Sequence, residues 1–387
     1  MPQFQQSIES AQPVAAVIIS VALMLFAGFA LTRITKLLRL PNVTAYILAG
    51  ILIGPYCLNL VPQRIIDGTD FLSDIALAFI AFSTGEFFKL SVLKKSGMRV
   101  VWITLFEAVL ASVFVFILTY FVLRLELAFS VVLAALASAT APASTMMTIR
   151  QTGAKGDFVD TLLQVVALDD VVGLVLYSVA ISVALASLGG SRGFSFETLV
   201  KPVLLNLAAL ALGGVFGLFM KLLMPERRST DNKLIISVAL LFAFCGVCAL
   251  IDVSPLLGCM AMGTVYTNVA ENDKLFKQLG YFSPPILLLF FVRSGMNFKL
   301  DALFSASGSL NGVPLIAVGV GYFLVRILGK YVGAWLGCAA VKKDRLVRNY
   351  LGLALIPQAG VAIGLAALGA RTLGCVMGSD LETIILA

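Results

Sequence analysis

Two adjacent aspartates, Asp169 and Asp170, occur inside the apolar stretch VVALDDVVGLVLYSVAISV at 165–183. In a helix surrounded by hydrocarbon, an ionised side chain costs about 2.5–3.5 kcal/mol even on lenient insertion scales, so such a pair persists only where it is paired, solvated or used. A carboxylate binds a proton, and when ionised its oxygens also bind hard cations. The two aspartates are therefore the first candidates for a buried ion-binding site.

Lys330, in the apolar stretch RILGKYVGAW, is the expected partner of one aspartate. Counted along their helices, the aspartates and Lys330 lie about 12–16 Å from the same membrane face. Successive side chains of a helix point in different directions, so Asp169 and Asp170 cannot face the amine equally. One carboxylate can then pair with the amine while the other exchanges a proton for a cation. A buried ion pair that only locks the helices together is the alternative.

These charges must be held by membrane-spanning helices, and we predict an all-α fold. The 387-residue chain is 60% hydrophobic and 13% charged, a composition typical of polytopic membrane proteins. Apolar runs predict twelve complete spans, at 13–32, 42–60, 71–88, 98–122, 127–149, 158–188, 200–222, 233–251, 254–270, 276–297, 312–340 and 347–370. A thirteenth begins at 381–387 and is too short to cross, so we expect the natural protein to continue beyond Ala387.

Positive charge is concentrated in the loops on one side of this arrangement. The formal net charge is +7, and most of the 28 Lys and Arg residues fall in every second loop, within segments such as TRITKLLR, PERRSTDNK and VKKDRLVR. The positive-inside rule makes those loops cytoplasmic, with the N-terminus outside and the C-terminus inside. Because the basic residues are dispersed in short loops, the expected partner is the lipid bilayer and not a nucleic acid.

Several kinds of chemistry are excluded or disfavoured by the residue types. The chain has no histidine, which excludes a histidine metal site or a histidine pH switch. Its six cysteines lie mostly in apolar runs, without the spacing of a disulfide framework. Neither a nucleophile with its base nor a metal-binding cluster is recognisable, so we expect neither an enzyme nor a bound cofactor.

An internal repeat relates distant parts of the chain. The segments FSTGEFFKLSVL (82–93) and VRSGMNFKLDAL (292–303) align without gaps and share Gly, Phe, Lys, Leu and Leu. One closes the third expected span and the other closes the tenth. Because an offset of seven spans is odd, the two copies must cross the membrane in opposite directions, which is typical of inverted-topology repeats in secondary transporters.

The same offset relates the fifth span, with Pro142 in ASATAPASTMM, to the twelfth, with Pro357 in LALIPQAGVAIG. A proline inside a helix removes a backbone hydrogen bond and clashes with the preceding turn. In lipid the freed carbonyls need partners, so such interruptions occur where they line a cavity or meet another helix. We expect two interrupted helices that cross at mid-membrane with half-helix ends near a bound ion, although a simple proline kink would give the same pattern.

Glu107, Arg293 and Arg326 also fall within the expected spans. Glu107 has a depth similar to that of the aspartates, and Arg326 is about one helical turn from Lys330. We expect Glu107 to pair with Arg326 or Arg293 in a structural charge network; a role in a proton path is the alternative.

Several motifs together resemble the bacterial monovalent cation:proton antiporter superfamily, in the paired-aspartate branch of sodium/proton antiporters. They are ALDDVVG in the sixth span, TAPAST in the fifth, GK in the eleventh and LPNVTAYILAGILIGP in the second. The resemblance implies a homodimer in the bacterial inner membrane, with about thirteen helices in inverted repeats. Spans 4–6 (98–188) and 11–13 (312–387) would form a core that moves like an elevator against a scaffold of spans 1–3 and 7–10.

The resemblance also implies roles for individual residues. Asp170 becomes the principal site for the transported cation and proton, holding sodium transiently, and Asp169 becomes the partner of Lys330. Thr140 is a neighbour at the first helix break, where Ser144 is a further polar group. Paired aspartates in that family usually accompany electrogenic exchange of two protons per sodium; potassium and lithium are alternative cations.

The chain departs from the family pattern at both breaks. Ala141 stands where some relatives carry an acid. Gln358, Ala359 and Gly360 stand where many relatives carry Arg-Gly-Glu. The resemblance therefore does not fix the charge balance or the choice of ion.

Two other functions are compatible with these features. A sodium-coupled symporter for an organic anion would need polar or cationic groups beside the sodium site, and the broken segments offer only Thr140, Ser144 and Gln358. A regulated gate, channel or sensor would depend on a regulating part that follows Ala387.

Overall fold

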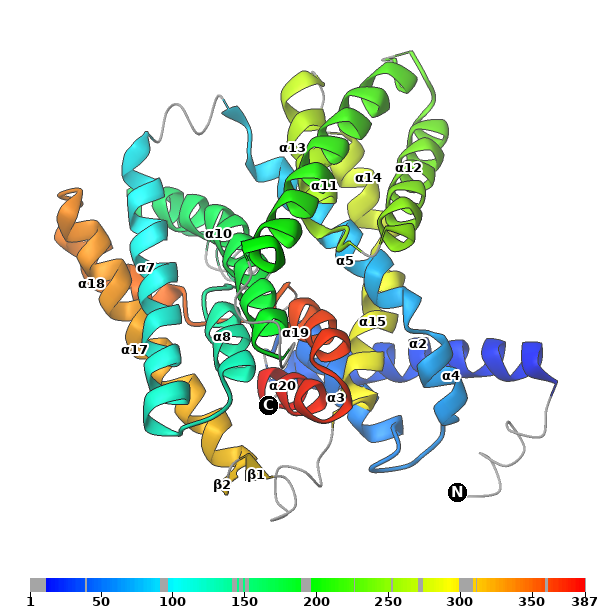
Figure 1. Ribbon diagram of the computed structural model, residues 1–387. Helices are drawn as coiled ribbons and strands as arrows, with labels where there is room; N and C mark the ends of the chain where they lie inside the picture. The colour runs from blue at the N-terminus through cyan, green and yellow to red at the C-terminus, as the bar shows by residue number, and fades with distance from the viewer. Residues whose placement is uncertain are drawn as a thin grey trace.

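The computed structural model is built almost entirely of helices, as the hydropathy pattern predicts (Figure 1). It describes residues 12–38, 40–90, 97–140, 145, 149, 153–188, 196–225, 227–251, 253–270, 274–298, 309–310, 312–358 and 361–386. The strands β1 (Ser309–Leu310) and β2 (Val313–Pro314) form a short antiparallel pair before one long helix.

The helices follow the chain in four groups. The first group is α2 (Pro13–Leu37), α3 (Asn42–Ile53), α4 (Gln63–Gly68), α5 (Phe71–Thr84) and the 3-10 turn η1 (Gly85–Phe87). The second is α7 (Met98–Phe116), the π-helical turn η2 (Ile117–Val122), α8 (Leu127–Leu136) and α10 (Asp157–Leu188). The third is α11 (Phe196–Leu223), α12 (Thr230–Leu250), α13 (Leu256–Val269), α14 (Lys274–Phe282) and α15 (Pro284–Met296). The fourth is α17 (Leu315–Ala340), α18 (Arg345–Ala354), α19 (Val361–Leu373) and α20 (Cys375–Leu386).

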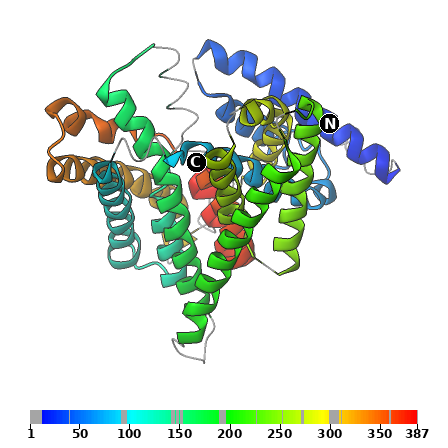
Figure 2. The same ribbon diagram turned by 90° about the horizontal axis from the view of Figure 1, so that it is seen from above.

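Six of the described helices are long and apolar enough to cross a membrane alone. The bent pair α14 and α15, at 48° to each other, would form a seventh, and five shorter apolar helices accompany them. The chain is therefore a multi-span membrane protein. In both views α19 and α20 lie between α7 with α17 on one side and α3 with α15 on the other (Figures 1 and 2).

The beginning of the last helix differs from the prediction. α20 begins at Cys375, whereas hydropathy placed the start of the thirteenth span at 381 because Ser379 and Asp380 precede the apolar run. Gly374, with φ of +85°, ends α19 in the left-handed conformation that glycine adopts readily. The chain therefore reverses at once, and α20 packs back along α19.

Helix packing agrees with the seven-span offset of the repeat. α3 packs against α15, and α5 packs against α13, which are equivalent pairs under that offset. A Cβ atom on Gly85 would lie 2.7 Å from the Cα of Gly263 on α13, and one on Gly295 would lie 3.1 Å from the Cα of Gly50 on α3. The two glycines aligned by the repeat therefore serve equivalent close helix crossings.

The crossing of α7 and α17 depends on three glycines spaced four residues apart. A Cβ atom added to Gly329, Gly333 or Gly337 would lie 2.5–2.8 Å from a Cα atom of α7. The three α7 residues approached in this way are Ala111, Glu107 and Ile103. Small residues at this spacing let two membrane helices touch through their backbones. The contact fixes the register of the two helices and brings the turn that contains Glu107 next to the turn of α17 that follows Gly329.

Two helices are interrupted near the middle of the bundle. α8 ends at Leu136 and residues 137–140 are not helical. In the equivalent position of the repeat, α18 ends at Ala354, residues 355–358 around Pro357 are not helical, and the helix resumes at Val361 as α19. Pro142 and Ser144 lie outside the described residues.

We expect Gly333→Ala to destabilise the protein, because its Cβ atom would meet the Cα of Glu107 at 2.5 Å. Overpacking of this kind typically costs about 1–3 kcal/mol. Gly319→Ala, on the same helix, is the matched control, since no atom lies within 4 Å of its added Cβ. Thermal unfolding in detergent measures the difference, and equal melting temperatures for the two variants would contradict the proposed contact.

Candidate ion-binding site

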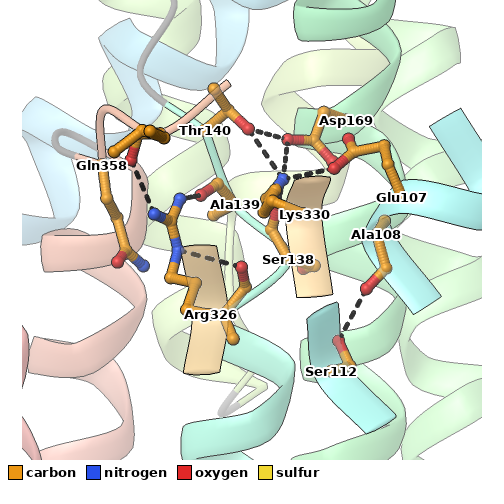
Figure 3. Close-up of polar contacts among 12 residues, drawn as sticks. Glu107, Ala108, Ser112, Ser138, Ala139, Thr140, Asp169, Arg326, Lys330 and Gln358 are labelled. Carbon is orange, nitrogen blue, oxygen red and sulfur yellow. Dashed lines mark hydrogen bonds and ion pairs between the residues drawn. The ribbon is translucent and has the colours of Figure 1, made fainter. Parts of the chain in front are cut away.

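A single buried ammonium connects four segments of the chain (Figure 3). Lys330 Nζ lies 2.8 Å from Asp169 Oδ2 and 2.8 Å from Glu107 Oε2, and all three side chains have no exposed surface. The ammonium also donates to the backbone carbonyl of Ser138 and to the hydroxyl of Thr140, the latter at 2.8 Å. The Thr140 hydroxyl in turn donates to Asp169 Oδ2. The amine of α17 thus joins α7, the break after α8, and α10.

Local packing explains why these groups meet. Lys330 follows Gly329, which contacts the backbone of α7 at Ala111. On α10, Gly173 lies one turn after Asp169, and its added Cβ would be 3.1 Å from Ser138 Oγ. The absence of a side chain at Gly173 lets α10 approach the interrupted segment closely, so that Asp169 reaches Lys330.

Arg326, one turn before Lys330, binds both interrupted helices. Its guanidinium donates to the carbonyls of Ala137 at 3.1 Å and Ala139 at 2.7 Å, beyond the end of α8. It also donates to the carbonyl of Ile356 at 2.6 Å, beyond the end of α18. A planar guanidinium with five N–H donors is suited to serve several carbonyls at once.

Four successive carbonyls at the end of α8 accept hydrogen bonds from side chains. Arg326 serves those of Ala137 and Ala139, Lys330 serves that of Ser138, and Gln358 Nε2 donates to that of Leu136 at 2.8 Å. Gln358 comes from the other break, so each interrupted segment contributes to satisfying its counterpart.

The positive charges also oppose the helix dipoles. The C-terminus of a helix carries roughly half a negative charge, which a nearby cation stabilises. Arg326 lies at the C-terminal ends of both α8 and α18. Arg326 therefore compensates part of the negative charge at both ends, and Lys330 adds to this at α8 through the Ser138 carbonyl.

The sequence prediction that Glu107 pairs with Arg326 or Arg293 is wrong. Glu107 contacts Lys330 and not Arg326 or Arg293, because the glycine contacts set α7 in register with Lys330 while Arg326 is engaged by carbonyls. Arg293 lies elsewhere, where it pairs with Asp70 and donates to the Ile66 carbonyl at 3.0 Å.

The structure describes the side chains of some of the remaining predicted site residues and not of others. Asp169, Thr140, Lys330 and Gln358 come together at the breaks. Asp170 follows Asp169 within α10, and its side chain lies outside the described part of the structure.

One polar residue at the site was not singled out from the sequence. Tyr322 exchanges hydrogen bonds with Gln358 at 2.9 and 3.0 Å. It precedes Arg326 and Lys330 on α17 at intervals of four residues, so its place on the same helix face could have been predicted.

Comparisons with known proteins show the family to which the chain belongs. Residues 20–387 match the family model described as sodium/hydrogen exchanger, transmembrane. The chain belongs to the sodium/hydrogen exchanger family. The motifs that pointed to cation:proton antiporters are thus confirmed at the level of the family.

Two solved structures of a sodium proton antiporter share the fold of this chain. The sodium proton antiporter MjNhaP1 from Methanocaldococcus jannaschii at pH 8 superposes with a TM-score of 0.73 at 20% sequence identity, covering 97% of this chain and 94% of that one. A second structure of MjNhaP1, from an electron-microscopy map, gives a TM-score of 0.72 at 19% identity, with the same coverage.

A curated relative is the iron transporter MagA from Paramagnetospirillum magneticum (strain ATCC 700264 / AMB-1). It is 25% identical over 293 residues, which make up 73% of this chain. The match spans 62% of that relative's length.

We predict that Arg326→Met lowers the stability of this exchanger-family chain strongly. The carbonyls of Ala137, Ala139 and Ile356 would lose their donor, and each buried unsatisfied group costs about 1–3 kcal/mol. Arg345→Met, which changes an exposed arginine, is the control. Thermal unfolding should show a clear loss only for Arg326→Met; a loss of the same size in both variants would argue against the role assigned to Arg326.

Proposed function

We propose that the chain is a secondary antiporter that exchanges a monovalent cation, with sodium first, for protons by alternating access. The observation that carries the proposal is the fully buried Lys330 ammonium, held against Asp169 where two helices are interrupted. Membership in the sodium/hydrogen exchanger family supports it. A buried acid with a dedicated cationic partner fits ion binding better than passive packing, because intramembrane charges are costly and are retained mainly where they serve a pathway.

The charges of this region leave room for an exchanged ion. Glu107 on α7 and the two aspartates of α10 are three acids, whereas α17 provides the cations Arg326 and Lys330. At least one acid therefore requires a proton or a metal cation to remain in a dry environment. We assign that role to Asp170, with Asp169 as the partner of Lys330 and Thr140 as a polar neighbour. A site that takes either ion but not both couples their movement.

The proposed movement is that of the core against the scaffold. Residues 98–188 and 312–387 form the core in this proposal, which contains both breaks and all the charges of the site. Residues of the first three spans and of spans seven to ten form the scaffold and the contact between two copies of the chain. Exchange of more than one proton for each sodium would make the transport electrogenic.

The test is exchange by purified protein in liposomes that contain a pH-sensitive dye. Adding sodium, potassium or lithium outside should dissipate a preset pH gradient if the chain is an antiporter. A symporter would respond only when an organic anion is supplied, and a channel would pass current without that coupling. Ferrous iron forms a further arm, because the name of the curated relative assigns iron to that protein.

We predict that Asp170→Asn abolishes exchange, since a neutral amide cannot give up a proton when a cation binds. Asp160→Asn is the matched control, because Asp160 lies on the same helix and is exposed. Both variants are measured in the dye assay at equal protein density. Full exchange by Asp170→Asn would contradict the assignment of the site.

Lys330→Met should lower the stability of the protein and change how that stability depends on pH. It should have less effect on which ion is transported. It leaves Asp169 and Glu107 without their ammonium, and breaking a buried pair in this way costs about 3–5 kcal/mol. Since a proton on Asp169 removes the negative charge that has lost its partner, the deficit relative to the wild-type protein should shrink as the pH falls. Thermal unfolding across a pH series measures this, and a deficit independent of pH would show that the acids are not its cause.

A further inference from the structure

Glu107 is a buried acid to which the proposed transport site gives no role. Its side chain has no exposed surface, and its Oε2 lies 2.8 Å from Lys330 Nζ. Among the described residues, neither of its carboxyl oxygens has a hydrogen-bond partner. A carboxyl group placed this way in a dry bundle is too costly to be incidental if it remains ionised.

The contacts of Lys330 show why Glu107 has no hydrogen bond. An ammonium has three N–H donors. All three are used, by the Ser138 carbonyl, the Thr140 hydroxyl and Asp169 Oδ2. Glu107 therefore lies 2.8 Å from an ammonium whose three donors already have other acceptors.

Charge balance leads to the same result. Arg326 is engaged by the C-terminal ends of α8 and α18, each of which carries roughly half a negative charge. Lys330 is then the cation left to balance both Asp169 and Glu107. Two acids that share one amine are one positive charge short, and a proton on Glu107 supplies it.

We propose that Glu107 is a second proton-binding residue of the transport site. In the arrangement seen here it holds a proton while Lys330 is hydrogen-bonded to Asp169. When a cation binds at Asp170 and Asp169 turns away from the ammonium, Glu107 releases its proton to water on the open side and takes over the ammonium. Lys330 is then never left as an unpaired buried charge. This inference rests on the proposed antiport.

Glu107→Gln tests the inference because glutamine has the shape of the protonated acid and cannot ionise. In the wild-type protein, protons on Glu107 compete with sodium, so the KM for sodium should fall as the pH rises. The variant is fixed in the form that resembles the protonated acid, which removes about a tenfold change in KM per pH unit over the range where Glu107 ionises. Its KM should therefore stay high at alkaline pH.

The measurement is the KM for sodium chloride over a pH series in the liposome dye assay. Glu107→Asp keeps a titratable group and should restore part of the pH dependence. Ser112→Ala is the matched structural control, because this α7 hydroxyl donates to the Ala108 carbonyl at 3.0 Å within its own helix and is not among the partners of Lys330 (Figure 3). Its pH dependence should equal that of the wild type.

The outcomes separate this inference from the function it rests on. Wild-type protein that exchanges no cation for protons overturns the proposed function, and the inference with it. Normal exchange by the wild type together with an unchanged pH dependence in Glu107→Gln overturns the inference alone. If Glu107→Gln is folded but inactive, exchange by Glu107→Asp supports the inference, and inactivity of both variants overturns it because the shape of the side chain would then be what matters.

Discussion

A helix that ends in the interior of a membrane protein leaves carbonyl groups that need hydrogen-bond donors, and the site in this chain is organised around that constraint. The carbonyls from Leu136 to Ala139 each accept a hydrogen bond from a side chain. The donors come from α17 and from the second break, so α17 has to run alongside both interruptions. The cations at the centre of the bundle are thus structural donors first, and their charges set the conditions under which nearby acids can ionise.

The same helix meets a second requirement, which is close packing. Gly329, Gly333 and Gly337 bring α7 against α17, and the polar residues of α17 occupy other positions of the same turns. Because the helices touch through their backbones, packing sets the position of Glu107 relative to Lys330. Electrostatics and packing are therefore not separable at this site, since moving the glycines would also change which acid faces the amine.

The sequence predicted those features that depend on local pattern. The depth of Asp169 and Lys330 follows from counting residues along helices, the interruption at 355–358 follows from Pro357, and the aligned glycines Gly85 and Gly295 follow from the repeat. The partners of Glu107 and Arg293 could not be predicted in the same way. Their pairing depends on the rotation of helices that are distant in sequence, and one-turn differences in register decide between Arg326 and Lys330.

The neutral residue at Gln358 follows from these constraints. The resemblance to cation:proton antiporters leads one to expect an arginine at this position, but in this chain Arg326 already serves the ends of both α8 and α18. A second guanidinium beside it would add an uncompensated positive charge to a dry region. The amide of Gln358 donates to the Leu136 carbonyl and exchanges hydrogen bonds with Tyr322, so it completes the break without adding charge. The departure at Gln358 thus keeps the positive charge of the site on α17, where Lys330 remains within reach of the acids of α7 and α10.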